Sequence, residues 1–187
     1  MIKISFAAGM VTVVVGWILF RFAAFLKNKK VDWKFEAKQI FFLINLAVIV
    51  RITFYPFATV NGQVQPLILE LDAVWPFRIN WIPLVNLLDY DNKFDLLINI
   101  IGNSTMFIPT GIMLPLIYRN IDGLKRVVLT GLAISLAIEL IQLPFAVRAS
   151  DVDDLLLNTA GCLTGFGILS ICRCLKKQIQ AKRNKAV

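Results

Sequence analysis

A group of acidic, amide and arginine side chains lies inside or directly beside the apolar stretches of this 187-residue chain. Carboxylates act as general acids or bases and accept hydroxyl and ammonium groups, whereas arginine binds phosphate through two parallel hydrogen bonds. The candidate catalytic residues are Glu139, Asp151 and Asp154, and the candidate binding residues are Arg51, Asn99, Asn103, Gln142, Arg148 and Asn158. The chain contains no His, which excludes His-based acid–base catalysis, His metal ligation and Ser–His–Asp triads.

The spacing of these residues predicts that each set occupies one face of a helix. Residues three or four apart lie on the same helix face. The spacings are Asn99 with Asn103, Glu139 with Gln142, and the series Asp151, Asp154, Asn158 and Gly161. Gly161 and Gly165 extend the last face as a GxxxG pattern, which lets a second helix approach closely.

Five apolar stretches must position these side chains. They cover about residues 4–26, 39–57, 96–118, 124–147 and 154–175, and about 20 residues are enough to cross a bilayer core of about 30 Å. Hydrophobic residues make up 58% of the chain, above the about 45–50% of soluble domains. We therefore predict an all-α integral membrane protein with five transmembrane helices. Pro109, Pro115 and Pro144 are expected to loosen the third and fourth helices.

The basic residues predict how the helices are oriented. They are dense in the first and third connections and at the C-terminus, and sparse in the second and fourth connections. Because cytoplasmic loops carry the excess of Lys and Arg, the N-terminus is expected outside and the C-terminus in the cytoplasm. The net charge of +8 is thus explained by topology, and no nucleic-acid partner is expected. The long second connection, residues 58–95, is acidic and carries Trp75 and Trp81, so we expect part of it to lie against the outer membrane surface.

In this orientation the polar residues of four helices fall at one depth near the outer surface. Polar groups inside a bilayer are costly and often mark a functional site. Arginine suits a phosphate-bearing headgroup, and the carboxylates, Asp153 included, suit sugar hydroxyls, ammonium groups or a divalent cation. Whether a metal binds is left open. No Ser or Cys is placed as an obvious nucleophile, and the three Cys residues are expected to be reduced and to serve packing.

Four segments resemble the VanZ family of membrane proteins. They are "INWIPL" with Asn80 and Pro83, "NSTMFIPTG" with Asn103 and Gly111, "IELIQ" with Glu139 and Gln142, and "RASDVDDLLLNTAG" with Arg148, Asp151, Asp154 and Asn158. The resemblance covers roughly residues 40–172, and Thr110 departs from it where an apolar residue is expected. It implies an association with resistance to the glycopeptide teicoplanin and a location in the bacterial cytoplasmic membrane. It does not imply a reaction.

The expected organisation is a first transmembrane helix with a basic cytoplasmic loop (1–38), a VanZ-like helical membrane domain (39–175) and a basic cytoplasmic tail (176–187). The leading hypothesis is an outer-leaflet site that binds, or binds and modifies, a cell-wall precursor lipid or a glycopeptide antibiotic. One alternative is a metal-assisted lipid-phosphate hydrolase or transferase. Another is a non-enzymatic subunit whose polar cluster only holds helices together. A transporter is disfavoured, because the inner halves of the helices are apolar and no inverted repeat is visible.

Overall fold

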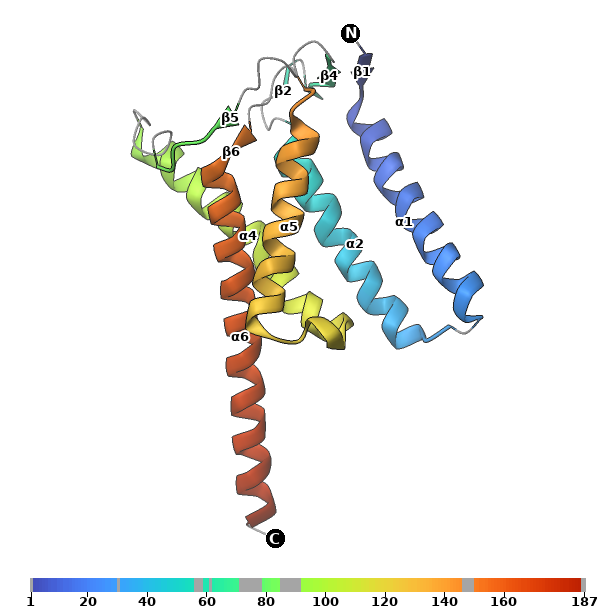
Figure 1. Ribbon diagram of the computed structural model, residues 1–187, viewed down its shortest axis with the longest axis vertical. Coiled ribbons are helices and arrows are strands. Elements are labelled where there is room, and N and C mark those ends of the chain that lie inside the picture. The colour runs from blue at the N-terminus through green and yellow to red at the C-terminus, as the bar shows by residue number, and fades with distance from the viewer. Residues whose placement is uncertain are drawn as a thin grey trace.

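The computed structural model describes residues 2–29, 31–55, 59–60, 62–70, 79–84, 92–145 and 150–185. Helices dominate these ranges: α1 (Phe6–Asn28), α2 (Trp33–Phe54), α4 (Lys93–Ile117), α5 (Leu124–Gln142) and α6 (Val152–Lys185), with a 3-10 turn η2 (Arg119–Ile121). Figure 1 shows α1 at one side of the bundle, with α4, α5 and α6 gathered at the other. The prediction of a mostly helical membrane protein is confirmed.

Within the described ranges, four helices are long and apolar enough to cross a membrane: α1, α2, α4 and α6. The exception is α5, which has 19 residues and carries Lys125, Arg126 and Glu139 within that length. At 1.5 Å per residue α5 is about 28 Å long, so its length is compatible with a span although its charge is unusual. The count of five spans and their orientation stay predictions.

Side-chain caps fix where the helices begin. Asp32 accepts hydrogen bonds from the backbone amides of Lys34 and Phe35 at 2.9 and 3.3 Å, so α2 begins at Trp33. The apolar stretch that begins at about residue 39 is therefore the later part of a helix that already includes Lys34 and Lys38, because these basic residues follow the capping Asp. Ser5 and Asn92 cap α1 and α4 in the same manner.

Short strands gather at one end of the bundle, which we call the strand end. Strand β1 (Ile2–Ile4) pairs with β4 (Leu67–Leu69), β2 (Thr59–Val60) pairs with β3 (Gln63–Val64), and β5 (Ile79–Asn80) pairs in parallel with β6 (Ser150–Asp151). An all-α prediction missed them, because two or three residues are too few to show an alternating pattern. Trp81 is exposed next to β5, whereas Trp75 lies outside the described residues.

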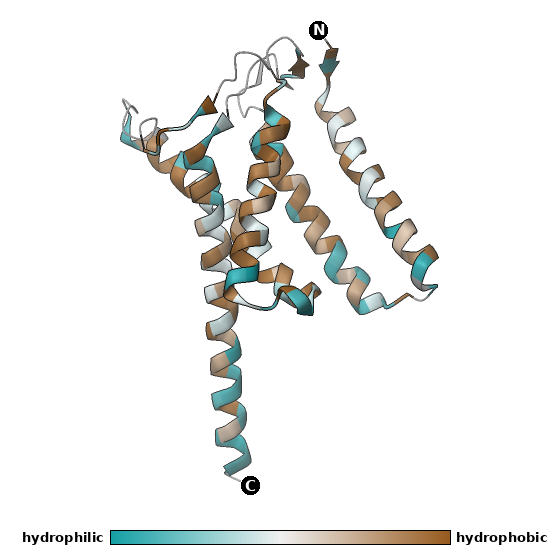
Figure 2. Ribbon diagram, in the orientation of Figure 1, coloured by the Kyte–Doolittle hydropathy of each residue, from teal (hydrophilic) through white to brown (hydrophobic). Residues whose placement is uncertain are grey.

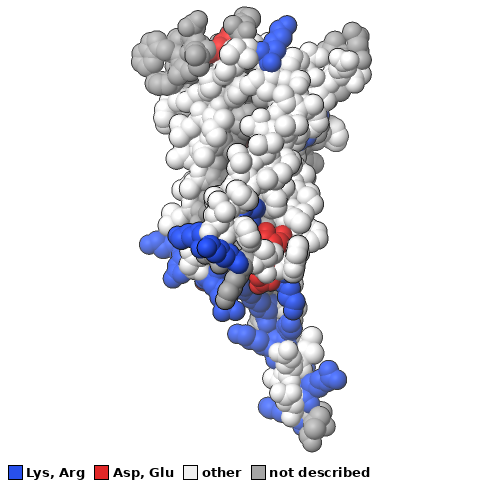
Figure 3. Space-filling model, turned by 90° about the vertical axis from the view of Figure 1, so that its right-hand side faces the viewer, with Lys and Arg blue, Asp and Glu red and all other residues white. Residues whose placement is uncertain are grey.

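Helix α6 is longer than a membrane crossing requires. Its 34 residues correspond to about 51 Å, against about 30 Å for a bilayer core. Residues 176–185, expected as a separate tail, therefore continue the helix beyond the bundle, and Figure 2 shows this extension as mostly hydrophilic. On the face drawn in Figure 3, Lys and Arg gather along this extension and at the end opposite the strands, which we call the basic end.

Glycines bring α4 and α6 into backbone contact. A Cβ atom on Gly161 would lie 2.1 Å from the carbonyl oxygen of Ser104, and one on Gly165 would lie 2.1 Å from that of Ile108. From the other side, a Cβ on Gly111 would lie 2.1 Å from the carbonyl oxygen of Cys162. The predicted GxxxG packing is thus confirmed. One continuous helix, α4, contains both Pro109 and Pro115.

Candidate functional site

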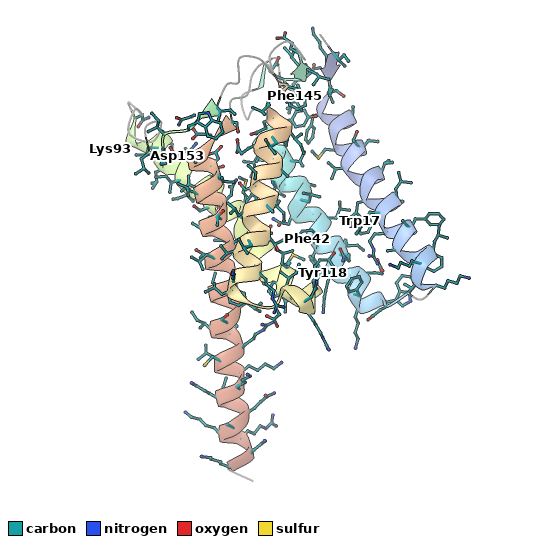
Figure 4. All side chains as sticks on the ribbon, viewed as in Figure 1. Trp17, Phe42, Lys93, Tyr118, Phe145 and Asp153 are labelled. Carbon is teal, nitrogen blue, oxygen red and sulfur yellow. The ribbon has the colours of Figure 1, made fainter. Side chains whose placement is uncertain are left out.

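Three helices and a strand pair bring acidic and amide side chains together at the strand end. Helix α5 ends there, α6 and α4 begin there, and β5 pairs with β6 directly before α6. Figure 4 labels Asp153 at the start of α6 and Lys93 at the start of α4. We call this group the carboxylate cluster, consisting of Asn80, Asn99, Asn103, Glu139, Ser150, Asp151, Asp153 and Asp154.

Glu139 is a buried acid of the cluster. It is 4% exposed, and its Oε2 accepts hydrogen bonds from the Ser150 hydroxyl at 2.9 Å and from the Asp151 amide at 3.0 Å. A buried carboxylate is tolerated when donors satisfy it, and hydrogen bonds to a charged acceptor are the strong ones. Glu139 therefore ties the chain entering α6 to the last turn of α5, a positioning role.

Asp151 and Asp153 hold the segment around β5. Asp151 Oδ1 accepts from the side-chain amide of Asn80 at 3.2 Å and from the backbone amide of Asp153 at 2.9 Å. Asp153 Oδ1 accepts from the backbone amide of Leu84 at 2.7 Å. Leu84 has a φ of +69°, a conformation that costs energy for a residue with a side chain. The bond to Asp153 stabilises that conformation.

Asp153 also carries an unsatisfied oxygen. The residue is 2% exposed, and its buried Oδ2 has no hydrogen-bond partner. An unpaired buried carboxylate oxygen is expensive, so such a group calls for a donor. Sequence reasoning named Asp153 only among several carboxylates and missed Ser150. Asp153 could have been singled out because it lies next to Asp154. It was not, because it falls outside the helical spacing that joins Asp151, Asp154 and Asn158.

Asp154 and Asn103 join the two helices that carry the cluster. The side-chain amide of Asn103 donates to Asp154 Oδ1 at 2.6 Å and to Asn99 Oδ1 at 3.3 Å. One turn further along α6, Asn158 is 1% exposed and donates to the Ser135 hydroxyl of α5 at 2.9 Å. The Oδ1 atom of Asn158 is buried without a partner. Both contacts lie on the predicted face of α6.

Arg51 and Gln142 belong to a different neighbourhood. Gln142 donates to the Thr53 carbonyl of α2 at 2.6 Å. Arg51 donates to the Tyr55 carbonyl at 2.7 Å, and its guanidinium lies 5.4 Å from the centre of the Phe6 ring. If the polar residues only held helices together, Glu139 would be expected to pair with Arg51 or Arg148. The described residues Arg51 and Glu139 form no ion pair with each other. Arg148 lies outside the described residues.

Tyr55 anchors this second neighbourhood to α1. Its hydroxyl donates to the Ser5 carbonyl at 3.2 Å, and its ring meets Phe6 edge-on. Burial raises the pKa of the Tyr55 hydroxyl, which keeps it a neutral donor. The predicted polar residues that the structure describes therefore lie in two groups, a carboxylate cluster on α4, α5 and α6 and an arginine site beside α1.

Two buried polar pairs were not predicted. The Thr110 hydroxyl donates to Asn45 Oδ1 at 2.6 Å, and Asn45 donates to the Met106 carbonyl at 3.0 Å. Gln39 donates to the Tyr118 hydroxyl at 2.9 Å. The polar residue at position 110, which departs from the VanZ pattern, thus has a partner on α2. The sequence shows that these residues are polar, but it does not show which residues lie opposite them.

The cluster has the chemistry of an acceptor site. Asp151, Asp153 and Asp154 occupy the first residues of α6 and the strand before it. Within the described part of the chain, no three acidic or cysteine side chains are arranged to hold a metal ion. Carboxylate and amide oxygens at the membrane boundary can accept hydrogen bonds from hydroxyl or ammonium groups of a ligand.

Comparison with known proteins gives the family. The family model VanZ/LLP1 matches residues 42–173, close to the 40–172 expected from the motifs. The chain is also similar to Protein VanZ of Enterococcus faecium, with 34% identity over 71 residues, covering 38% of this chain and 44% of that protein. The matched part thus spans less than half the length of that relative. No solved structure matches. Since the family model covers more than half of the chain, the protein belongs to the VanZ/LLP1 family.

Proposed function

We propose that this VanZ-family protein binds, through its carboxylate cluster, the polar part of a cell-wall precursor lipid or of a glycopeptide antibiotic, and thereby gives teicoplanin-type resistance. The observation that supports this proposal most directly lies at the start of α6. There, beside Asp151 and Asp154, a buried carboxylate oxygen of Asp153 has no hydrogen-bond donor. A ligand with ammonium or hydroxyl groups would supply donors. The association with teicoplanin resistance that the family resemblance implies also supports a role in resistance.

The proposal includes five spans, with the strand end outside and the basic end in the cytoplasm of a bacterial cell. The gathering of Lys and Arg at the basic end supports this orientation. Cysteines introduced at Gln65 and Lys182, in a chain with Ser at positions 172 and 174, test it with a membrane-impermeant thiol reagent added to intact cells. Labelling at position 65 alone is expected. Labelling at position 182 alone would reverse the orientation.

Asp154→Asn is the most informative variant. The change keeps size and removes a charge, and Asn103 can still donate to the remaining carbonyl oxygen. We expect folded protein at normal levels but a minimum inhibitory concentration of teicoplanin that falls to that of cells lacking the protein. Asp122→Asn is the matched control, because Asp122 is an exposed acid at the basic end, paired with Arg173 at 2.7 Å. The control is expected to keep full resistance.

Two results would argue against the proposal. If Asp154→Asn and Asp122→Asn gave equal resistance at equal protein levels, the cluster would have no role in resistance. If resistance fell only in proportion to folded protein, measured by gel filtration of a fluorescent fusion, the cluster would act as a helix-holding element, as in the structural alternative. The metal-assisted alternative predicts instead that chelators abolish resistance.

A further inference from the structure

An apolar groove of about 490 Å³ runs between α2 and α4. Helix α2 contributes Phe41, Val48 and Ile52 to its walls, and α4 contributes Gly102, Met106 and Met113. Both wall segments lie inside candidate membrane spans. Phe41 and Val48 are exposed, so the groove opens sideways, toward the bilayer. Any occupant must therefore be a group that is stable in hydrocarbon.

The groove extends along the membrane normal from the strand end. Helix α2 runs toward the strand end and α4 runs away from it, so Ile52 and Gly102 mark the upper end and Phe41 and Met113 the lower end. At 1.5 Å per residue each wall is about 16 Å long. The upper end lies at the level of the carboxylate cluster along α4, since Gly102 immediately precedes Asn103, which donates to Asp154.

The width of the groove selects the kind of occupant. The volume open to the centres of water-sized spheres, about 490 Å³, spread over about 16 Å leaves about 9 Å between the walls once a water radius of about 1.4 Å is added on each side, whereas an α-helix with side chains is about 10–12 Å wide. A single hydrocarbon chain therefore fits better than a partner helix. Met106 and Met113, with flexible thioether side chains, suit a chain of variable conformation.

The polar residue in the groove is already satisfied within the protein. Asn45 lines the groove, but its amide donates to the Met106 carbonyl and its carbonyl oxygen accepts from Thr110. Both hydrogen-bonding groups of the Asn45 side chain, the amide nitrogen and the carbonyl oxygen, are therefore engaged by α4. Because Asn45 is satisfied by α4, the lining of the groove stays suited to an apolar chain.

We infer that this groove holds the hydrocarbon tail of a membrane lipid whose headgroup reaches the carboxylate cluster. The inference rests on the proposed function and sharpens it: the ligand is a lipid carrying ammonium or hydroxyl groups, not a water-soluble glycopeptide. The tail supplies apolar contact along α2 and α4, and the headgroup supplies donors to the acids at the start of α6.

Filling the groove is the test. The space around the Cβ position of Gly102 is open, with no atom within 4 Å, and Gly102 lines the groove, so Gly102→Phe is chosen to fill its upper end. The full chain is placed in phosphatidylcholine vesicles that contain a phosphatidylethanolamine with a mid-chain diazirine. After illumination, labelled peptides are quantified by mass spectrometry. Val14 and Ile18 of α1, which are exposed and apolar, report labelling by bulk lipid.

We expect groove residues 41–52 and 102–113 to be labelled well above α1, and Gly102→Phe to lower that labelling about tenfold, the scale expected when about two methylene groups lose their buried site. Gly167→Phe is the matched control, because its Cβ position is equally open and lies on α6. It should change neither labelling nor resistance. Val48→Phe narrows the groove from α2 and serves as the second variant.

The outcomes separate this inference from the proposed function. Groove labelling no higher than α1, or unchanged in folded Gly102→Phe and Val48→Phe, would overturn the tail site even if Asp154→Asn abolishes resistance. Retained resistance in both groove variants, with Asp154→Asn still inactive, would point to a water-soluble ligand and also overturn it. Groove labelling that Gly102→Phe removes, together with unaffected resistance in Asp154→Asn, would sustain the tail site and remove the proposed function.

Discussion

Two helix pairs in this molecule are joined in contrasting ways. Helices α4 and α6 meet backbone to backbone at Gly111, Gly161 and Gly165. Helix α1 is joined to α2 by the Arg21–Glu36 ion pair, and no residue of its span is buried. Between α1 and α2 lies a crevice of about 350 Å³. Figure 4 labels Trp17, Phe42 and Tyr118, three residues that line it.

The difference follows the family match. Residues 42–173 match the family model, which includes all of α4, α5 and η2 but leaves α1 out. The carboxylate cluster is built on the tight pair, since Asn103 of α4 donates to Asp154 of α6. Close backbone contact fixes the separation of the two helices, and small interfacial residues are what permit it in a membrane. We conclude that the α4–α6 pair sets the geometry of the site and that α1 is an attachment to it.

The largest expected effect comes from breaking the tight pair. Gly161→Leu would place a side chain where the Ser104 carbonyl oxygen now lies, and backbone cannot move aside as a flexible side chain can. We expect a loss of at least about 3 kcal/mol of stability, at the upper end of overpacking costs, and little monodisperse protein. Thermal unfolding in detergent measures it. Gly167→Leu, at an open position of the same helix, should unfold like the parent. Equal stability of the two variants would contradict glycine-dependent packing.

An intermediate effect is expected from the buried pair between α5 and α6. Ser135→Ala removes the acceptor of the Asn158 amide, and interhelical hydrogen bonds in membrane proteins contribute about 0.6–2 kcal/mol. Ser170→Ala is the control, because the Ser170 hydroxyl donates within its own helix, to Phe166 at 2.8 Å. Denaturation of both variants in mixed detergent micelles gives the difference. A Ser170→Ala effect as large as that of Ser135→Ala would mean that the interhelical bond has no special weight.

The sequence predicted which regions would be apolar and which helix faces would be polar, because both follow from residue type and spacing. It predicted the contact face of α6 through Gly161 and Gly165. It could not assign partners. Arg51 was a candidate partner for Glu139, yet Arg51 lies against Phe6 and Tyr55. Depth along a helix is readable from sequence, whereas rotation about the helix axis relative to neighbours depends on tertiary packing.

The strands illustrate a second limit. Glu139 accepts from Ser150 and Asp151, and β6 pairs with β5, so residues far apart in sequence meet at the cluster. A two-residue strand is too short to show a periodic sequence pattern. The positive φ of Leu84 also has no sequence pattern that predicts it. The family motif that contains Asn80 and Pro83 indicated only that this segment belongs with the others. Its contacts with Asp151 and Asp153 came from the structure.

The smallest expected effect tests the attachment of α1. Arg21 of α1 forms an ion pair with Glu36 of α2, with Nε 3.0 Å from Oε2, and its guanidinium lies 5.2 Å from the centre of the Phe35 ring. Both side chains are partly exposed, and such pairs contribute about 0–1 kcal/mol. A double-mutant cycle with Arg21→Gln and Glu36→Gln should therefore give a coupling energy below about 1 kcal/mol.

The same variants should keep teicoplanin resistance, because α1 lies outside the family match and does not supply the carboxylate cluster. Raising the salt concentration should weaken the coupling further, since partly exposed charges are screened. A coupling above about 2 kcal/mol, beyond the range of exposed pairs, would show that α1 is held as firmly as α6. Loss of resistance in folded Arg21→Gln protein would show that α1 contributes to function. The tight α4–α6 pair could then no longer be described as the site and α1 as a mere attachment to it.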